Sequence, residues 1–174
     1  MLAKNDFKKL VELGTLFAFD LIIKNKNGDV LLGKRTNSPA KGFWFVPGGR
    51  VFKNETLSQG IRRVSKSEIG IEIGQKDIIP LGIYEHIYKD NFFDDKNFGT
   101  HYIILACHVI KKINAINFKS EQHCHYEFFP VERLLKSKVV HQFIKNYFIE
   151  KGFPNLLDSF IEFLQDIKFL YTLL

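Results

Sequence analysis

The sequence has few residues of the types that build disulfide or zinc frameworks. Its 174 residues include two cysteines, Cys107 and Cys124, which are too few for a disulfide-stapled fold. Reduced thiols are typical of cytoplasmic proteins, and we therefore predict a cytoplasmic location. The N-terminal segment 1–14 is charged and lacks the apolar run of a secretion signal, which favours the same prediction.

The chain also lacks a long apolar segment and a concentrated basic tract. Charged residues interrupt the apolar stretch 155–174 and predict an amphipathic helix, not a membrane span: Asp158, Glu162, Asp166 and Lys168. The net charge is +6, yet the basic residues are scattered as pairs such as Arg62-Arg63. Nucleic-acid binding favours a concentrated patch, so we expect neither a nucleic acid nor a membrane as partner.

No internal repeat or flexible linker divides the chain, so we predict one domain over residues 1–174. Aromatic and β-branched residues predict strands at 15–24, 29–36, 78–88 and 101–111. The turn signal Asn27-Gly28 predicts that the first two of these strands pair as a hairpin. A polar loop, 89–99, is long for a hairpin connection and is therefore a candidate functional loop.

Apolar periodicity predicts helices at 56–69, 131–136, 139–151 and 155–172. Thr56 or Asn54 is suited to cap the start of the first helix. Strands are followed by one helix, more strands and then C-terminal helices. This order predicts an α+β fold, an α/β/α sandwich with a mixed central sheet.

Residues around the first predicted helix suggest phosphate binding. The pair Gly48-Gly49 allows the backbone to approach a ligand closely, and the N-terminal region of a helix favours bound phosphate. Arg50 and Arg35 carry guanidinium groups that could contact a diphosphate in bidentate fashion. Alone, the glycine pair is more typical of a plain tight turn, and Glu68 is equally typical of a solvated surface residue.

Six positions fit the spacing of the Nudix box, G-x5-E-x7-R-E-U-x-E-E-x-G-U, where U is aliphatic: Gly49, Glu55, Arg63, Glu68, Gly70 and Ile71. The chain therefore resembles Nudix proteins, which hydrolyse nucleoside diphosphates linked to another moiety with divalent metal held by glutamates. It departs from the box where Val64 and Ser67 replace glutamates and Ser65 replaces the aliphatic residue. Each lost carboxylate removes an oxygen ligand, so a multi-metal cluster is not expected.

The same losses occur in the GDP-mannose mannosyl hydrolase branch, which the chain resembles over about residues 5–150. The similar segments are LLGKRTNSPAKGFWFVPGGRV (31–51), Tyr84-Glu85-His86, Thr100-His101-Tyr102 and Glu121-Gln122-His123. The resemblance implies a Nudix fold for about residues 1–152, a C-terminal helical extension over about 153–174, and a homodimer.

The resemblance further implies that water attacks C1 of the sugar with inversion and releases GDP. The substrate would be GDP-mannose or a close GDP-hexose. One Mg²⁺ ion per site, with Mn²⁺ as an alternative, would be held by the Gly48 carbonyl, Glu68 and Gln122. His123 would be the general base, because histidine titrates near neutral pH. His101 and His125 are competing candidates for that role.

The remaining implied roles concern the substrate. Arg35 and Arg50 would bind and stabilise the departing GDP, and Tyr102 would donate a hydrogen bond to it. Arg63 would support the metal side, although a purely structural pair with Glu55 fits its spacing equally well.

Asp20 and His86 would assist in the mannose pocket, although His86 also fits an ordinary strand histidine. Phe7 would contact the substrate across a dimer interface.

Two other functions stay open at this point. One is a Nudix pyrophosphatase that attacks phosphorus and forms GMP and a sugar phosphate. The other is a non-catalytic domain that binds a nucleotide-sugar and regulates a partner. Val64 and Ser67 argue against the first, because they remove carboxylates that attack at phosphorus uses in this superfamily. His123 argues against the second, because binding alone requires no base.

Overall fold

The structure, a computed structural model, describes residues 2–111, 113 and 123–149, with only the backbone of residues 123 and 124. Its helices are α1 (Lys4–Leu13), α2 (Leu57–Ile69), the short 3₁₀ helix η1 (Gln75–Asp77), α3 (Val131–Lys136) and α4 (Gln142–Ile149). Its strands are β1 (Leu16–Ile23), β2 (Val30–Arg35), β3 (Trp44–Phe45), β4 (Gly48–Arg50), β5 (Ile78–Tyr88), β6 (Thr100–Val109) and β7 (His123–Phe129). The predicted helix 155–172 lies outside the described residues.

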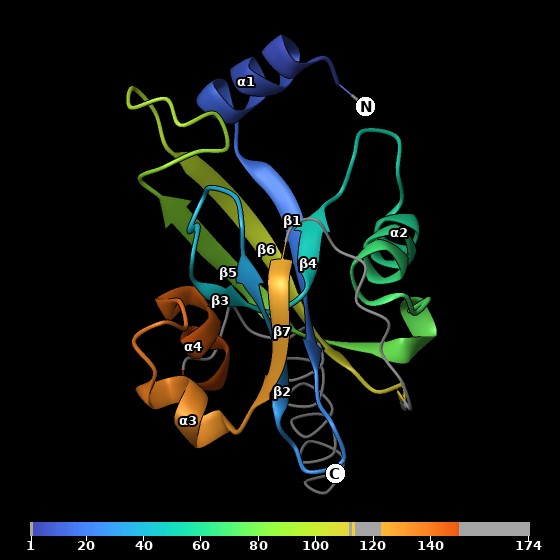
Figure 1. The fold of residues 1–174 in the computed structure, drawn as a ribbon. Helices are drawn as coiled ribbons and strands as arrows, with labels where there is room; N and C mark the ends of the chain where they lie inside the picture. The colour runs from blue at the N-terminus through green and yellow to red at the C-terminus, as the bar shows by residue number, and fades with distance from the viewer. Residues whose placement is uncertain (1, 112, 114–122, 150–174) are drawn as a thin grey trace, which may run out of the picture.

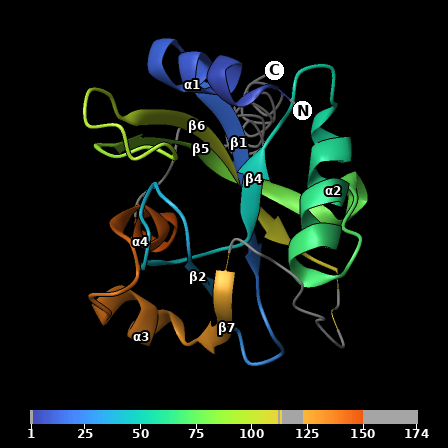
Figure 2. The same ribbon diagram turned by 45° about the horizontal axis from the view of Figure 1, so that its top comes forward.

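The strands form two sheets, one of four strands in the order β4-β1-β6-β5 and one of three in the order β3-β2-β7. The larger sheet is mixed, because β1 runs parallel to β6 and antiparallel to β4. Figures 1 and 2 show α2 on one side of the strands and α3 and α4 on the other. The predicted α+β sandwich with a mixed sheet and flanking helices is therefore confirmed.

The predicted hairpin between 15–24 and 29–36 is wrong. β1 and β2 belong to different sheets and meet only through a single antiparallel bridge between Lys24 and Val30. The physical reason is that β6 pairs with all of β1 along one edge and β4 pairs with Ala18–Asp20 along the other, which leaves little of β1 for β2.

Strand β1 contributes side chains to two separate cores. Phe19, Leu21 and Ile23 pack with α2 residues in one core. Ala18 and Ile22 pack with residues of α3 and α4 in the other: Leu134, Ile144 and Tyr147. Because side chains alternate along a strand, Asp20 lies between Ala18 and Ile22 and faces the α4 side.

Helix α2 begins and ends where the sequence predicts. The Thr56 hydroxyl accepts a hydrogen bond from the Gln59 amide at 3.2 Å, and the Gln59 side chain accepts one from the Thr56 amide at 2.8 Å. This capping box confirms Thr56 as the N-cap. Gly70 closes the helix with a left-handed φ of 70°, which suits glycine.

Five elements were not predicted from the sequence: α1, η1, β3, β4 and β7. Helix α1 has apolar Phe7, Leu10 and Val11 at helical spacing, a signal that the sequence offered, although only Val11 is buried. Strands β3 and β4 have two and three residues, too few for a period-2 pattern. In the part of the chain that the structure describes, no helix is both long enough and apolar enough to cross a membrane.

Candidate active site

The carboxyl group of Glu68 lies beneath the backbone of β4. Glu68 is 3% exposed, and the Gly48 amide donates a hydrogen bond to its Oε2 at 3.3 Å. Burial raises the pKa of Glu68 to about 8, against the opposing effects of the Gly48 amide and the Arg35 charge. A buried carboxylate requires compensating positive charge. A divalent cation fits this requirement, and oxygen donors are the ligands that Mg²⁺ prefers.

Gly48 is required where β4 passes over Asp20. The two residues are paired across β1 and β4, and a Cβ atom at position 48 would overlap the Asp20 carboxyl and lie 2.5 Å from the Phe19 carbonyl oxygen. Any side chain here would push β4 away from β1. The backbone of Gly48 is thus held next to both Asp20 and Glu68.

At the positions of two box glutamates, Val64 and Ser67 supply no carboxylate. Val64 is buried, and its Cγ2 lies 2.8 Å from where a Cβ atom on Gly49 would be, so it packs directly under the glycine pair. Ser67 is exposed, and its hydroxyl donates to the Val64 carbonyl at 3.0 Å. Within the described residues, no group of three or more His, Cys, Asp or Glu side chains could hold a metal ion. The predicted ligand Gln122 lies outside them.

Arg63 ties α2 to the loop that follows β4. Its Nε and Nη2 donate to the two carboxylate oxygens of Glu55 at 2.7 and 2.8 Å, and Nη2 also donates to the Arg50 carbonyl at 2.9 Å. The guanidinium group also lies over the Phe52 ring, 3.9 Å from its centroid. These bonds hold the pKa of Glu55 below its usual range. Of the two roles considered for Arg63, the geometry favours positioning of the loop.

Arg50 lies between α1 and the sheet. Its guanidinium carbon is 3.8 Å from the centroid of the Phe7 ring, a cation–π contact within one chain. Phe7 also packs against Phe92 and Phe93 of the loop 89–99. Helix α1 and this loop therefore enclose Arg50 from one side, and the predicted contact of Phe7 across a dimer interface stays a prediction.

Arg35 lies close to several of the predicted site residues. Its Nε donates to the Pro39 carbonyl at 2.9 Å. Burial raises the pKa of both Asp20 and Tyr102, and the positive charge of Arg35 opposes this effect at both residues. The backbone of His123 is paired with Arg35 across β7 and β2. Because Tyr102 is paired with His86 across β6 and β5, these two face the same side of the sheet.

Asp20 and His86 are joined by a tyrosine that the sequence did not single out. The Tyr147 hydroxyl donates to Asp20 Oδ2 at 2.6 Å and lies 3.1 Å from His86 Nε2. Burial raises the pKa of Asp20 to about 6 and lowers that of His86 to about 3. In sequence, Tyr147 looks like one more apolar residue of a core helix, because only its hydroxyl distinguishes it.

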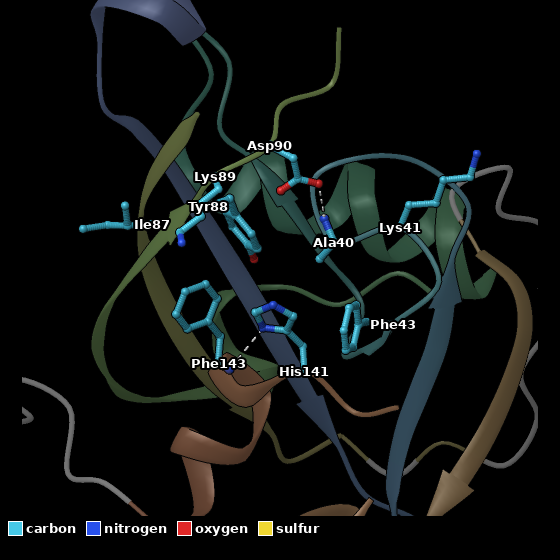
Figure 3. A pocket seen from close by; sticks show the side chains of 9 residues that line it. All are labelled: Ala40, Lys41, Phe43, Ile87, Tyr88, Lys89, Asp90, His141 and Phe143. Atoms are coloured by element: carbon cyan, nitrogen blue, oxygen red, sulfur yellow. Dashed lines mark hydrogen bonds between the residues drawn. The ribbon is translucent and has the colours of Figure 1, made fainter. Parts of the chain in front are cut away.

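A pocket of about 370 Å³ opens beside His86, between the segments 40–43, 87–90 and 141–143. Figure 3 shows four rings around it, from Phe43, Tyr88, His141 and Phe143. Asp90, at the rim, accepts a hydrogen bond from the Ala40 amide at 3.0 Å. Phe143 stacks on His86 with ring centroids 4.4 Å apart, so the pocket shares a wall with the Asp20–His86 pair.

The competing histidines lie elsewhere. His101 contacts the Thr15 hydroxyl at 3.3 Å and the Glu85 carboxylate at 3.8 Å, on the opposite side of the sheet from its neighbour Tyr102. His125 is exposed, with its ring edge against Trp44. The side chain of His123 is outside the described part, so its role as base stays a prediction.

The α+β sandwich and the retained box residues are the features of the Nudix hydrolase class. The chain matches the NUDIX domain over residues 14–150 and therefore belongs to the Nudix family. It is a Nudix hydrolase, and its family generally uses a divalent metal such as Mg²⁺.

Two proteins that are similar in sequence have names that indicate different functions. The low-salt glycan biosynthesis protein Agl8 of Haloferax volcanii is 34% identical over 145 residues, which cover 82% of this chain and 86% of Agl8. The ADP-ribose pyrophosphatase of Methanocaldococcus jannaschii is 36% identical over 91 residues, which are 52% of each chain.

Solved structures show the same fold. The MutT Nudix hydrolase of Burkholderia pseudomallei has a TM-score of 0.64 and 19% identity, over 78% of this chain and 97% of that one. The NUDIX domain of Shewanella oneidensis NrtR, solved with ADP-ribose, has a TM-score of 0.58 and 16% identity, over 86% and 98%. At these identities the likeness concerns the fold alone.

Proposed function

We propose that this Nudix hydrolase cleaves GDP-mannose, or a close GDP-hexose, to GDP and free sugar in a reaction that requires Mg²⁺. The observation that carries the proposal is the buried carboxylate of Glu68 beside Gly48, with Val64 and Ser67 at the positions of two box glutamates. Attack at a sugar carbon requires fewer metal ligands than attack at phosphorus, because GDP is already a good leaving group.

In the proposed reaction, the oxygen of a water molecule bonds to C1 of the sugar and the bond from C1 to the diphosphate oxygen breaks. His123 takes the proton from the water. Arg35 and Arg50 compensate the charge that develops on GDP, and Tyr102 donates a hydrogen bond to it. Glu68, the Gly48 carbonyl and Gln122 would hold one Mg²⁺, which neutralises diphosphate charge when bound. Asp20 and His86 belong to the sugar side, and His86 stacks on Phe143, which lines the pocket of Figure 3.

The description of Agl8 as a glycan biosynthesis protein supports a sugar-linked substrate, since Agl8 covers most of the chain. A second candidate is a pyrophosphatase that attacks phosphorus, and the similarity of about half the chain to an ADP-ribose pyrophosphatase favours it. The homodimer and the cytoplasmic location stay predictions.

Product identification separates these functions. Purified protein is incubated with GDP-mannose and Mg²⁺ in ¹⁸O-labelled water, and the products are analysed by mass spectrometry. We expect GDP and mannose, with the label in mannose. GMP and mannose phosphate would establish the pyrophosphatase, and binding without turnover would establish a regulatory domain.

The general base is tested by His123→Gln, which we expect to lower kcat by about 10²–10⁴-fold. His125→Gln, two residues away and exposed, is the matched control. An unchanged kcat in His123→Gln would remove this residue from the mechanism.

A further inference from the structure

Helix α4 brings a buried hydroxyl to the residues of the sugar side. Tyr147 Oη lies 2.6 Å from Asp20 Oδ2 and 3.1 Å from His86 Nε2, and Tyr88 Oη lies 3.3 Å from His86 Nδ1. Tyr147, Asp20 and His86 are 4%, 8% and 2% exposed, so water competes little for these bonds. Four side chains from β1, β5 and α4 therefore form one continuous hydrogen-bonded chain, Tyr88–His86–Tyr147–Asp20.

The chemistry of the groups gives this chain a direction. An ionised carboxylate only accepts hydrogen bonds, so the proton of the Tyr147 hydroxyl points to Asp20. The Tyr147 oxygen then presents lone pairs to His86, whose Nε2 must carry the imidazole proton. In a neutral imidazole the other nitrogen is an acceptor, so the Tyr88 hydroxyl donates to Nδ1.

The surroundings keep the imidazole neutral and its plane fixed. Burial, together with the charges of His141 and Arg35, lowers the pKa of His86 to about 3. The ring stacks on Phe143 with an interplanar angle of 7° and a centroid distance of 4.4 Å. Both stacking and hydrogen bonding thus come largely from α4, through Phe143 and Tyr147.

We propose that Tyr147 is a positioning residue, which orients the Asp20 carboxylate and holds His86 in the tautomer protonated on Nε2. The proposal rests on the proposed function, in which Asp20 and His86 belong to the sugar side. It also specifies what the pocket presents to its ligand. Because the Tyr88 proton is committed to His86, the Tyr88 oxygen at the pocket wall accepts a hydrogen bond from a ligand hydroxyl. A hydroxylated ring such as a hexose offers such donors.

The tautomer can be measured without any substrate. Long-range ¹⁵N–¹H correlation spectra of the His86 ring are recorded at about pH 8, above the ordinary pKa of histidine, so that the neutral imidazole is observed. We expect the Nε2–H tautomer in the wild-type protein. In Tyr147→Phe the ring keeps its packing against Tyr84, 4.7 Å away, but Nε2–H loses its acceptor. The Nδ1–H tautomer, with the Tyr88 oxygen as acceptor, then becomes populated.

The matched control is Tyr84→Phe, which removes a hydroxyl from the tyrosine that packs on Tyr147 and leaves the four-residue chain complete. We expect the control to retain the Nε2–H tautomer. A wild-type protein with the Nδ1–H tautomer, or a Tyr147→Phe variant with the wild-type tautomer, would overturn the proposal.

Kinetics give an independent reading. A change in the surroundings of a functional residue typically costs 10–100-fold in activity, and we expect Tyr147→Phe to lower kcat for GDP-mannose by about that factor. KM should change by less than about threefold, since no predicted substrate contact is removed. An unchanged kcat would overturn the positioning role. If the wild-type protein does not hydrolyse GDP-mannose, the proposed function fails, while the tautomer measurement still decides the role of Tyr147.

Discussion

The two sides of β1 stabilise their buried carboxyl groups by different means. On the α4 side, Asp20 receives a short hydrogen bond of 2.6 Å from Tyr147, itself bonded to His86. On the α2 side, Glu68 receives a bond of 3.3 Å from the Gly48 amide. Burial raises the pKa of Asp20 to about 6 but that of Glu68 to about 8. On the α4 side, hydrogen bonds thus fix the orientation of the Asp20 carboxyl group. On the α2 side, an added cation would stabilise the buried charge of Glu68.

The largest expected effect is on the α2 side. Glu68→Gln preserves shape and hydrogen bonding but removes the charge that would hold Mg²⁺. We expect kcat/KM for GDP-mannose to fall by about 10³-fold, equal to roughly 4 kcal/mol of transition-state stabilisation. The measurement is the initial rate across a Mg²⁺ titration, with the exposed Glu72→Gln as control. A variant as active as the wild-type protein would show that the α2 side does not depend on a cation at Glu68.

A smaller effect is expected from the loop that Arg63 holds. Arg63→Lys cannot reproduce the two parallel bonds to Glu55 together with the bond to the Arg50 carbonyl. We expect a loss of about 10–100-fold in kcat/KM, because Arg50 loses its support. Arg62→Lys, at the adjacent exposed position, should stay within about twofold. Equal activities of the two variants would contradict the positioning role of Arg63.

The stability of the metal-free protein should depend on pH through Glu68. Its folded pKa of about 8 exceeds the ordinary glutamate value of 4.5, so the folded state binds more protons than the unfolded state between these values. Stability is therefore lost as the pH rises from 4.5 to about 8. Between about pH 5 and 8 we expect Tm to fall without metal, and we expect Mg²⁺ to restore it near pH 8, at about 2–4 °C for each kcal/mol. Scanning fluorimetry with EDTA or Mg²⁺ measures this.

The matched variant for this pH effect is Glu68→Gln, in which both the fall in Tm and the response to Mg²⁺ should disappear. If Mg²⁺ raises the Tm of Glu68→Gln as much as that of the wild-type protein, the cation binds elsewhere.

The smallest effect is expected when one missing acid is restored. Ser67 is exposed, and its hydroxyl donates to the Val64 carbonyl of the same helix. Ser67→Glu should therefore change the free energy of unfolding by less than about 0.5 kcal/mol. We also expect the products to remain GDP and sugar, because Val64 still supplies no carboxylate. Urea denaturation and product analysis check both expectations, and a switch to GMP would show that one acid decides which bond breaks.

Most features of the α2 side could be predicted from local sequence. The Gly48-Gly49-Arg50 segment, the Thr56 cap, the periodicity of α2 and the box spacing all lie within 24 consecutive residues, 48–71. Helix geometry then places Glu68 and Arg63 relative to the loop with little help from the rest of the chain. The prediction of the α+β sandwich and of helix α2 follows from such local patterns.

The α4 side depended on pairings that are distant in sequence. Asp20, His86 and Tyr147 are separated by at least 61 residues, and no local pattern distinguishes Tyr147 from a core residue. The wrong hairpin has the same origin, because the partners of β1 are β4 and β6 and not its neighbour in sequence.

The sequence by itself determined which acids of the Nudix box are missing and which arginines are candidates to bind a diphosphate, because these depend only on residue type and spacing. The tertiary structure decided that Val64 packs under Gly49, that Arg63 supports the loop and that Tyr147 joins Asp20 to His86. The physical reason is that burial and hydrogen-bond direction depend on what the whole chain places around a group, and residues far apart in sequence supply most of those surroundings.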